Sequence, residues 1–240
     1  MAFISSNQTR IIYGTDSLAA LLRTVSPSAN VEMLDATTLN DTAKTFVPGL
    51  EDFTLNVDGL FDNNTGAGTP FADIVAAIDA TSTVPTSVAP SGFAVGNSVW
   101  LLPAKTITYE VTSAVADLVQ FSMSLGAGEP PQIGVSLADL ADITATGNGT
   151  SVDNAAGTTN GGRAHLHVTA VSGTTPTLAV IVQHSTNNST WSTLATFTTA
   201  TAVTSQTLTF SGTVNRYVRA SYTAGGTSPQ FTCQVSLARN

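Results

Sequence analysis

The chain has 240 residues, only 10% of which are charged, and a formal net charge of −8 at pH 7. Soluble globular proteins carry charge on about a quarter of their residues. The charge is also divided unevenly: residues 1–150 hold four bases against 15 acids, a balance of −11, whereas residues 151–240 hold four bases against one acid, a balance of +3. The acidic first part excludes ordinary nucleic-acid binding there, because affinity for phosphate requires Lys and Arg.

Cys233 is the only cysteine, which excludes an intramolecular disulfide and a cysteine zinc cluster. Its alternation with Phe231 and Val235 predicts a buried position in a strand. The N-terminus, MAFISSNQTR, lacks the basic and apolar regions of a secretory signal. No apolar run approaches the roughly 20 residues of a membrane-spanning helix. We therefore expect a chain that folds in a reducing cytosol and does not insert into a membrane.

The first predicted element is a short helix over residues 18–26, LAALLRTVS. Asp16 and Ser17 are suitable capping residues, and Pro27 ends the helix because proline disfavours helical backbone at the residue before it. Two strands follow, over 31–37 and 52–61.

A polar loop over 38–46 and a turn at Pro48-Gly49 separate these two strands. The second strand alternates strictly, which predicts one buried and one exposed face. The apolar face carries Phe53, Leu55 and Val57, and the polar face carries Thr54, Asn56 and Asp58.

A second helix is predicted over 70–80, with Thr69 as N-cap and Pro70 at the first helical position. Its apolar spacing indicates that one face packs on a sheet. Three further strands are predicted, over 93–102, 105–113 and 118–125. The first module, residues 1–143, is therefore expected to be an α+β domain without a parallel sheet.

Residues 144–162 are rich in Gly, Asn and Thr, which is typical of a linker. Beyond them the pattern predicts six short strands and no helix, and so a small antiparallel β-sandwich over 163–240. The whole chain is expected to be mainly β. The six strands are 164–171, 177–184, 191–198, 205–211, 216–223 and 230–238.

Three histidines raise the question of a zinc site, since His165 and His167 share one strand face and His184 lies on the next strand. A turn centred between residues 174 and 175 places His165 opposite His184, whereas a three-residue turn centred on Thr174 separates them. The second register keeps the apolar side chains together. We therefore predict surface histidines, no metal site and no cofactor.

Other candidates for chemistry are weaker. Asp139 and Asp142 are spaced as on one exposed face of a helical turn, and no G-x-S-x-G nucleophile motif is present. The sequence thus predicts no enzymatic activity. Arg216, Tyr217 and Arg219 form a basic-aromatic patch that could contact glycan, lipid or nucleic acid, or simply be solvent-exposed residues of a sandwich strand.

One combination of motifs carries a resemblance. A polar loop, then F-V-P-G-L-x-D, an alternating strand that ends in D-G-L-F-D, a helix and an S-V-W-L-L strand span roughly residues 30–140. This order resembles the major tail tube proteins of long-tailed bacteriophages. The second module, from TATGNGTSVDN to FTCQVSLA, resembles β-sandwich modules appended to such proteins and to other virion proteins.

The resemblance implies a tail-tube-like β-sandwich or barrel with a packed helix in residues 1–143, which polymerises, and a decoration domain in residues 163–240. Such subunits form rings, typically hexameric, that stack into a tube for DNA ejection. DNA passes without specific binding, and the tape measure and tail terminator proteins are partners. The location would be the virion tail, assembled in the host cytoplasm.

Within this family, Thr54, Asn56 and Asp58 would face the lumen. The loop region 38–50 would contact the next ring, through Asn40, Asp41, Lys44, Pro48 and Gly49. The alternative is another virion protein, such as a head-decoration protein or a β-sandwich protein that contacts a receptor or carbohydrate.

Overall fold

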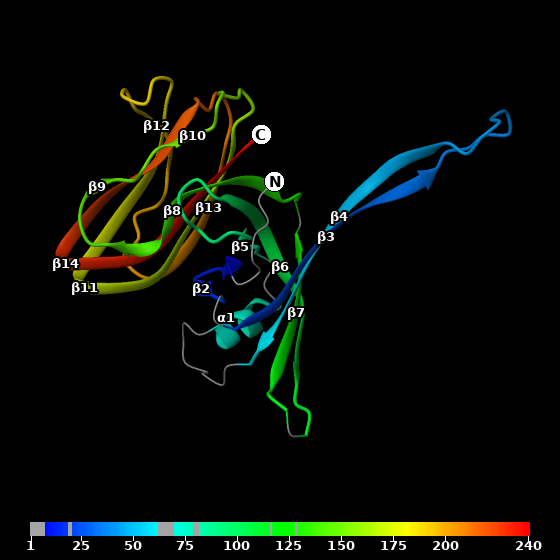
Figure 1. Cartoon of the computed structure of the whole chain (residues 1–240), viewed down its shortest axis with the longest axis horizontal. Helices are drawn as coiled ribbons and strands as arrows, with labels where there is room; N and C mark the ends of the chain where they lie inside the picture. Colours follow the sequence, from blue (N-terminus) through cyan, green and yellow to red (C-terminus); the bar gives the residue numbers. More distant parts are fainter. Residues whose placement is uncertain (1–7, 19–20, 62–69, 79–81, 116, 128) are drawn as a thin grey trace.

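The computed structural model describes all residues except 1–7, 19–20, 62–69, 79–81, 116 and 128 (Figure 1). The described part is almost entirely antiparallel: one 14-stranded sheet runs through the chain, accompanied by the short helix α1 (Pro70–Ala77). The prediction of a mainly β fold with a packed helix is confirmed. The proposed N-cap Thr69 lies outside the described residues.

Four strands form what we call the N-terminal sheet, in the order β3 (Leu22–Asp35), β4 (Phe46–Leu60), β7 (Gln120–Ala127) and β6 (Ser98–Thr112). One face of this sheet is buried against Ile74 of α1 and its neighbours. The buried side chains alternate along β4 and β7, as the period of a strand requires. They are Phe53, Leu55, Val57, Phe121, Met123 and Leu125.

The predicted helix over 18–26 is wrong. Asp16–Ser17 is the short strand β2, and residues 22–26 begin β3, which pairs with β4 along nearly its whole length. A helix this short has little stability of its own, so the long ladder of strand pairing decides the backbone conformation. Pro27 is accommodated because β3 is an edge strand, where a missing N–H costs no pairing.

The outer parts of β3 and β4 form a projecting ribbon that we call the arm, residues 30–52 (Figure 1). Its tip is the connection 36–45, where the backbone N–H of Thr38 donates to Asp41 Oδ2 at 2.7 Å. The predicted Pro48-Gly49 turn is wrong, because both residues lie inside β4. The ladder shifts register there, between the pairs Val31–Glu51 and Met33–Pro48.

Two further strands beside β6 were not predicted: β5 (Val84–Ala89) and β8 (Gln132–Ile143). Strand β6 joins two predicted segments, because residues 98–102 of the segment 93–102 and most of the segment 105–113 lie in one strand that continues through Pro103. Strand β7 corresponds to the predicted segment 118–125. The predicted helical turn with Asp139 and Asp142 is wrong, since both residues lie in β8. Strand β8 pairs with β6 and with β14 (Tyr217–Arg239).

The C-terminal region forms a sandwich around two long, bent strands, β11 (Gly162–Ser185) and β14, which pair with each other throughout. All six predicted strand segments occur, but two pairs are fused: 164–171 with 177–184 in β11, and 216–223 with 230–238 in β14. Each strand bends near a glycine with positive φ, Gly173 in β11 and Gly226 in β14. The shorter strands are β9 (Gly147–Asn148), β10 (Val152–Asp153), β12 (Ser192–Thr196) and β13 (Thr204–Phe210).

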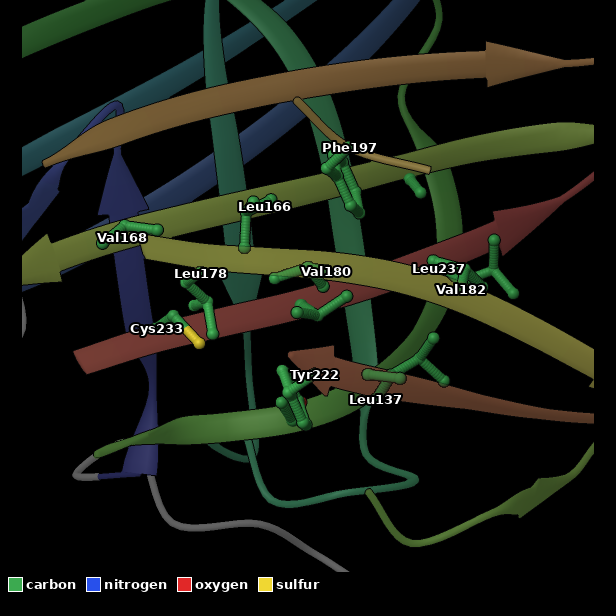
Figure 2. Packing of buried hydrophobic residues seen from close by; sticks show 14 of the residues in the cluster. Leu137, Leu166, Val168, Leu178, Val180, Val182, Phe197, Tyr222, Cys233 and Leu237 are labelled. Carbon is green, nitrogen blue, oxygen red and sulfur yellow. The ribbon is translucent and has the colours of Figure 1, made fainter. Parts of the chain in front are cut away.

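The bends fold each long strand onto itself, so that its two halves face each other across one core. Leu166 and Val168 of the first half of β11 belong to the same buried cluster as Val180 and Val182 of the second half (Figure 2). Cys233 is fully buried in this core, as predicted, and burial raises the pKa of its thiol to about 12. A thiol in this state is a packing residue and not a nucleophile.

The two regions share the sheet. Strand β8 pairs with β14, and its Leu137 packs in the sandwich core. The boundary predicted at residue 143 therefore follows a strand that hydrogen-bonds into the second region, and it stays a prediction. Among the described residues, no helix has the length and apolarity to span a membrane.

Candidate assembly surfaces

The open face of the N-terminal sheet carries the three residues predicted to face a lumen. Asn56 and Asp58 are exposed and Thr54 is half-buried, whereas the residues between them are buried. The predicted alternation of β4 is therefore confirmed, and the assignment to a lumen stays a prediction. The residues paired with these three share their face: Ser28, Ser26 and Thr24 on β3, and Gly126, Ser124 and Ser122 on β7.

This open face is rich in hydroxyl groups and carries few charges. Register places Asp52, Asp58 and Glu110 on it, and Lys105 lies opposite Gly126. Arg23, at the edge of β3, donates from Nη1 to Gln120 Oε1 at 3.1 Å. With three carboxylates and two bases, the face has a slight acidic excess and offers few cations to a phosphate.

The N-terminal sheet has two open edges among the described strands. Strand β3 pairs only with β4, which leaves its outer edge free. Beyond Ala104, the strand pairing described for β6 is with β7, because the pairing of β6 with β5 stops at Ala104. Unpaired edges present rows of N–H and C=O groups that template further pairing, and most isolated proteins cover or blunt them.

The arm exposes large apolar side chains on both of its faces. Leu34 lies opposite Val47 on one face, and Met33 lies opposite Pro48 on the other. Val31 and Phe46 lie two residues from Met33 and Pro48, which places them on the same face as that pair. Exposed fractions of 49% for Leu34, 56% for Met33 and 47% for Phe46 show that the body of the chain covers neither face.

The residues predicted to contact a neighbouring ring all lie on this arm. Asn40, Asp41 and Lys44 are exposed in its tip, and Pro48 and Gly49 are in β4. Lys44 Nζ lies 3.7 Å from Asp35 Oδ2, and hydrogen bonds from Thr37 lower the pKa of Asp35. The structure therefore gathers these residues on one projecting element, and their contact with another ring stays a prediction.

The sequence pattern missed the apolar part of the arm. The tip was predicted as polar, and the stretches VEML and TFV were not recognised as apolar on both faces. The signal was present, because a strand that buries one face alternates, and these stretches do not alternate cleanly.

A cavity of about 220 Å³ lies at the base of the arm. Its walls include Phe53, Pro130 and Pro131, and three carboxylate side chains line it as well: Glu51, Asp52 and Glu129. Glu129 also forms an ion pair with Arg163 of β11, whose side chain is nearly buried. Val31 of the arm also lines the cavity. The exposed apolar surface of the arm therefore continues into a cavity that has both apolar and acidic side chains.

The histidines do not lie on the surface, so that prediction is wrong for His165 and His167. Both are fully buried, because the outer face of β11 packs against β5 and the turn after β1 (Arg10–Tyr13). Ser87 Oγ lies 3.2 Å from His165 Nδ1 and 2.8 Å from His167 Nε2. His167 Nδ1 donates to the carbonyl of Gly14 at 2.7 Å, so its neutral Nε2 accepts from the Ser87 hydroxyl.

His184 lies apart from this pair and accepts a hydrogen bond from the backbone N–H of Asn215 at 3.2 Å. Neither of the two predicted registers occurs, because the halves of β11 pair with β14 and not with each other: His165 lies opposite Ser236 and His184 opposite Val218. Across the described residues, no group of three or more His, Cys, Asp or Glu side chains could hold a metal ion.

The basic-aromatic patch is present, with one additional residue that the sequence did not reveal. The Arg219 guanidinium carbon lies 4.1 Å from the ring centroid of Trp191, and Arg219 Nε donates to Gln183 Oε1 at 2.8 Å. Arg216 stacks on Tyr217 at 5.0 Å. The sequence pattern does not place Trp191 in the patch, because Trp191 lies in the loop before β12, far from the arginines in sequence.

No family model matches the chain, and no curated protein matches it. Among solved structures, a chain of the native gene transfer agent virion is similar, with 12% identity and a TM-score of 0.44 over 55% of this chain and 98% of that chain. The SPP1 tail tube is similar over 54% of this chain and 78% of that chain, with 14% identity and a TM-score of 0.43. The SPP1 Dit protein, from the hub adsorption apparatus, is similar over 96% of this chain and 98% of that chain, with 12% identity and a TM-score of 0.40. As the sequence resemblance predicted, the similar structures include phage tail proteins.

Proposed function

We propose that this chain is a structural, non-enzymatic subunit of a phage tail tube. The observation that supports this most is the N-terminal sheet, which has one buried face, one hydroxyl-rich open face and, among the described strands, two open edges. A sheet of this kind is incomplete in an isolated chain, because its edges would pair with other sheets. When copies of the chain repeat around an axis, the edges of each sheet can pair with the edges of its neighbours.

Ring closure follows from joining the free edge of β3 in one copy to the free edge of β6, residues 105–112, in the next. This contact is heterologous, since the two surfaces differ, and a fixed rotation between copies closes it into a ring. We propose a hexamer. The open faces would then form a continuous inner wall, with Thr54, Asn56 and Asp58 towards the channel.

Stacking of rings would use the arm. A two-stranded ribbon is marginally stable in water on its own, and the apolar side chains on both faces of the arm gain stability when another copy covers them. Asn40, Asp41, Lys44, Pro48 and Gly49 are the proposed contacts with the neighbouring ring. A contact along the axis does not close, so it adds rings without limit.

The proposed tube conducts DNA during ejection without binding it specifically. A wall of hydroxyl groups with a slight acidic excess holds few counter-charges for phosphate, so the duplex can slide. The tape measure and tail terminator proteins would be the partners that set tube length. The location would be the virion tail, after assembly in the host cytoplasm.

Electron microscopy of the purified full chain tests the proposal. Rings or tubes with a central channel are the expected result. A stable monomer, or a closed trimer without an axial stack, would instead favour the alternative of a head-decoration protein or a β-sandwich protein that contacts a receptor or carbohydrate.

A further inference from the structure

The second region carries three arginines near one end of its sandwich, which together we call the basic cluster: Arg216, Arg219 and Arg239. Asp153 is the only Asp or Glu side chain of residues 151–240, and it is paired with Arg216. All three side chains are exposed or half-exposed. The cluster stands out in a chain whose net charge is −8.

Arg219 is held in one orientation by two contacts. Its guanidinium carbon lies 4.1 Å from the ring centroid of Trp191, and its Nε donates to Gln183 Oε1. Among the described residues, no hydrogen bond occupies its two Nη groups. A guanidinium fixed in this way presents a free edge to solvent at little further entropic cost on binding, and carboxylate or phosphate groups suit that edge.

The other two arginines are fixed by the loop 153–156. Arg216 donates from Nε and Nη2 to the two carboxylate oxygens of Asp153, each at 2.6 Å. Arg239 Nη1 donates to the carbonyl of Ala156 at 2.6 Å, on the other side of that loop. The loop thus connects the two cations, and Tyr217 lies between Arg216 and Arg219 in sequence.

Neutral hydrogen-bonding groups lie near Arg219 on the same sheet face. Ser221 lies two residues beyond Arg219 on that face, and Asn148 is paired opposite Ser221. Thr193 is paired opposite Gln183. Hydroxyl and amide groups of this kind donate to and accept from sugar hydroxyls.

We propose that the basic cluster binds an anionic polysaccharide, with the Nη groups of Arg219 on a carboxylate or phosphate of the polymer. The surrounding amide and hydroxyl groups contact the sugar hydroxyls. Each site is weak because it offers few charges, and a repeating polymer compensates by engaging several copies of the protein at once.

The observations favour a polysaccharide over a nucleic acid. Three cations, one of them engaged by Asp153, would release few counterions from a duplex and would give little affinity for DNA. The first 150 residues, with a balance of −11, repel the dense charge of a nucleic acid at longer range. A polysaccharide with no more than one charge per sugar has a lower charge density than a DNA duplex and is repelled less.

Binding of the full chain to surfaces coated with polygalacturonate, neutral dextran or double-stranded DNA, in low salt, tests the proposal. The wild type is expected to bind polygalacturonate and not dextran. Arg219→Gln should weaken binding about tenfold, which corresponds to the loss of one charge-assisted hydrogen-bonding group. Trp191→Ala should weaken it too, because Arg219 loses its fixed orientation.

Arg10→Gln is the matched control, since it removes one positive charge at an exposed position outside the basic cluster and outside the proposed assembly contacts. It should leave binding to polygalacturonate unchanged. The proposal is overturned if Arg10→Gln weakens binding as much as Arg219→Gln, if dextran binds equally well, if DNA binds more tightly than polygalacturonate, or if the wild type binds no polygalacturonate. Arg216→Gln, at an exposed position, provides a second variant if Arg219→Gln does not fold.

Discussion

At the residue scale, the hydrogen-bonded chain His165–Ser87–His167–Gly14 joins the two regions of the protein. All of its groups are buried, and the imidazoles are neutral because burial disfavours their charged form. Desolvation lowers the pKa of His167 to about 4, and it lowers that of His165 well below its usual value. Neutrality of this pair is therefore a condition of the fold.

A loss of stability in mild acid follows from these pKa values. Between pH 6.5 and pH 4 the unfolded chain protonates its histidines while the folded chain does not, so the unfolded state binds more protons and stability falls as pH falls. His167 alone should lower the free energy of unfolding by about 2 kcal/mol between pH 7 and pH 4.5. Urea unfolding at a series of pH values measures this, and a flat free energy from pH 7 to pH 4.5 would contradict it.

Ser87→Ala tests the same series of hydrogen bonds, His165–Ser87–His167–Gly14, without a change of pH. The substitution removes the hydroxyl shared by both imidazoles and leaves buried ring nitrogens without a partner, at a cost of about 1–3 kcal/mol. Ser26→Ala, on the exposed face of β3, is the control and should change stability by less than about 0.5 kcal/mol. Equal effects of the two substitutions, measured by chemical denaturation, would show that Ser87 carries no special contact.

Residue-level prediction succeeded where local pattern decides the outcome. The alternation of Phe53, Leu55 and Val57 fixes which face of β4 is buried, since strand geometry is set by neighbouring residues. The burial of His165 and His167 could not be predicted in the same way. They lie on the outer face of the sandwich, and only the packing of β5 and Gly14 against that face covers them.

At the scale of elements, the arm and the long ladder behind it explain why prediction failed for the helix over 18–26 and for the turn at Pro48-Gly49. A short apolar stretch such as LAALL fits helix and strand alike, and β3 exists because β4 pairs with it over a long ladder. Its outer half buries nothing within the chain. Local pattern reading assumes a buried face in the same chain, and here the partner of the arm is proposed to be another copy.

Substitutions on the arm should therefore separate assembly from folding. Val47→Asp and Phe46→Asp place a charge on opposite faces at exposed positions, so each should change the thermal midpoint of the monomer little. Both should reduce assembly, because a carboxylate in an apolar contact is costly to desolvate. Thr213→Asp, at an exposed position of the C-terminal region, is the control with the same added charge.

Sedimentation velocity gives the distribution of monomer and assembly, and thermal unfolding gives the stability of each variant. The proposal for the arm predicts a shift to monomer for the two apolar positions and an unchanged distribution for Thr213→Asp. If all three variants assemble as the wild type does, the arm is not an assembly contact.

At the scale of the whole molecule, the continuity of the sheet lay beyond sequence reasoning. The pairing of β8 with β14 joins residues nearly a hundred positions apart, and no local pattern encodes such a partner. The uneven distribution of charge, by contrast, can be seen in the sequence alone. It distinguishes an acidic region, whose sheet is proposed to line a channel, from a region that carries the basic cluster.

Charge reversal at Asp58 tests the channel at this scale, because one substitution repeats in every subunit of every ring. Asp58 is exposed on the open face of β4, so Asp58→Lys should permit folding and assembly. The added cations would attract phosphates along the whole path of the DNA and slow its passage. Asp139→Lys, at an exposed position in β8, makes the same change of charge elsewhere and should leave the rate of DNA ejection from intact particles unchanged. Ejection at the wild-type rate from fully assembled Asp58→Lys particles would remove Asp58 from the channel wall.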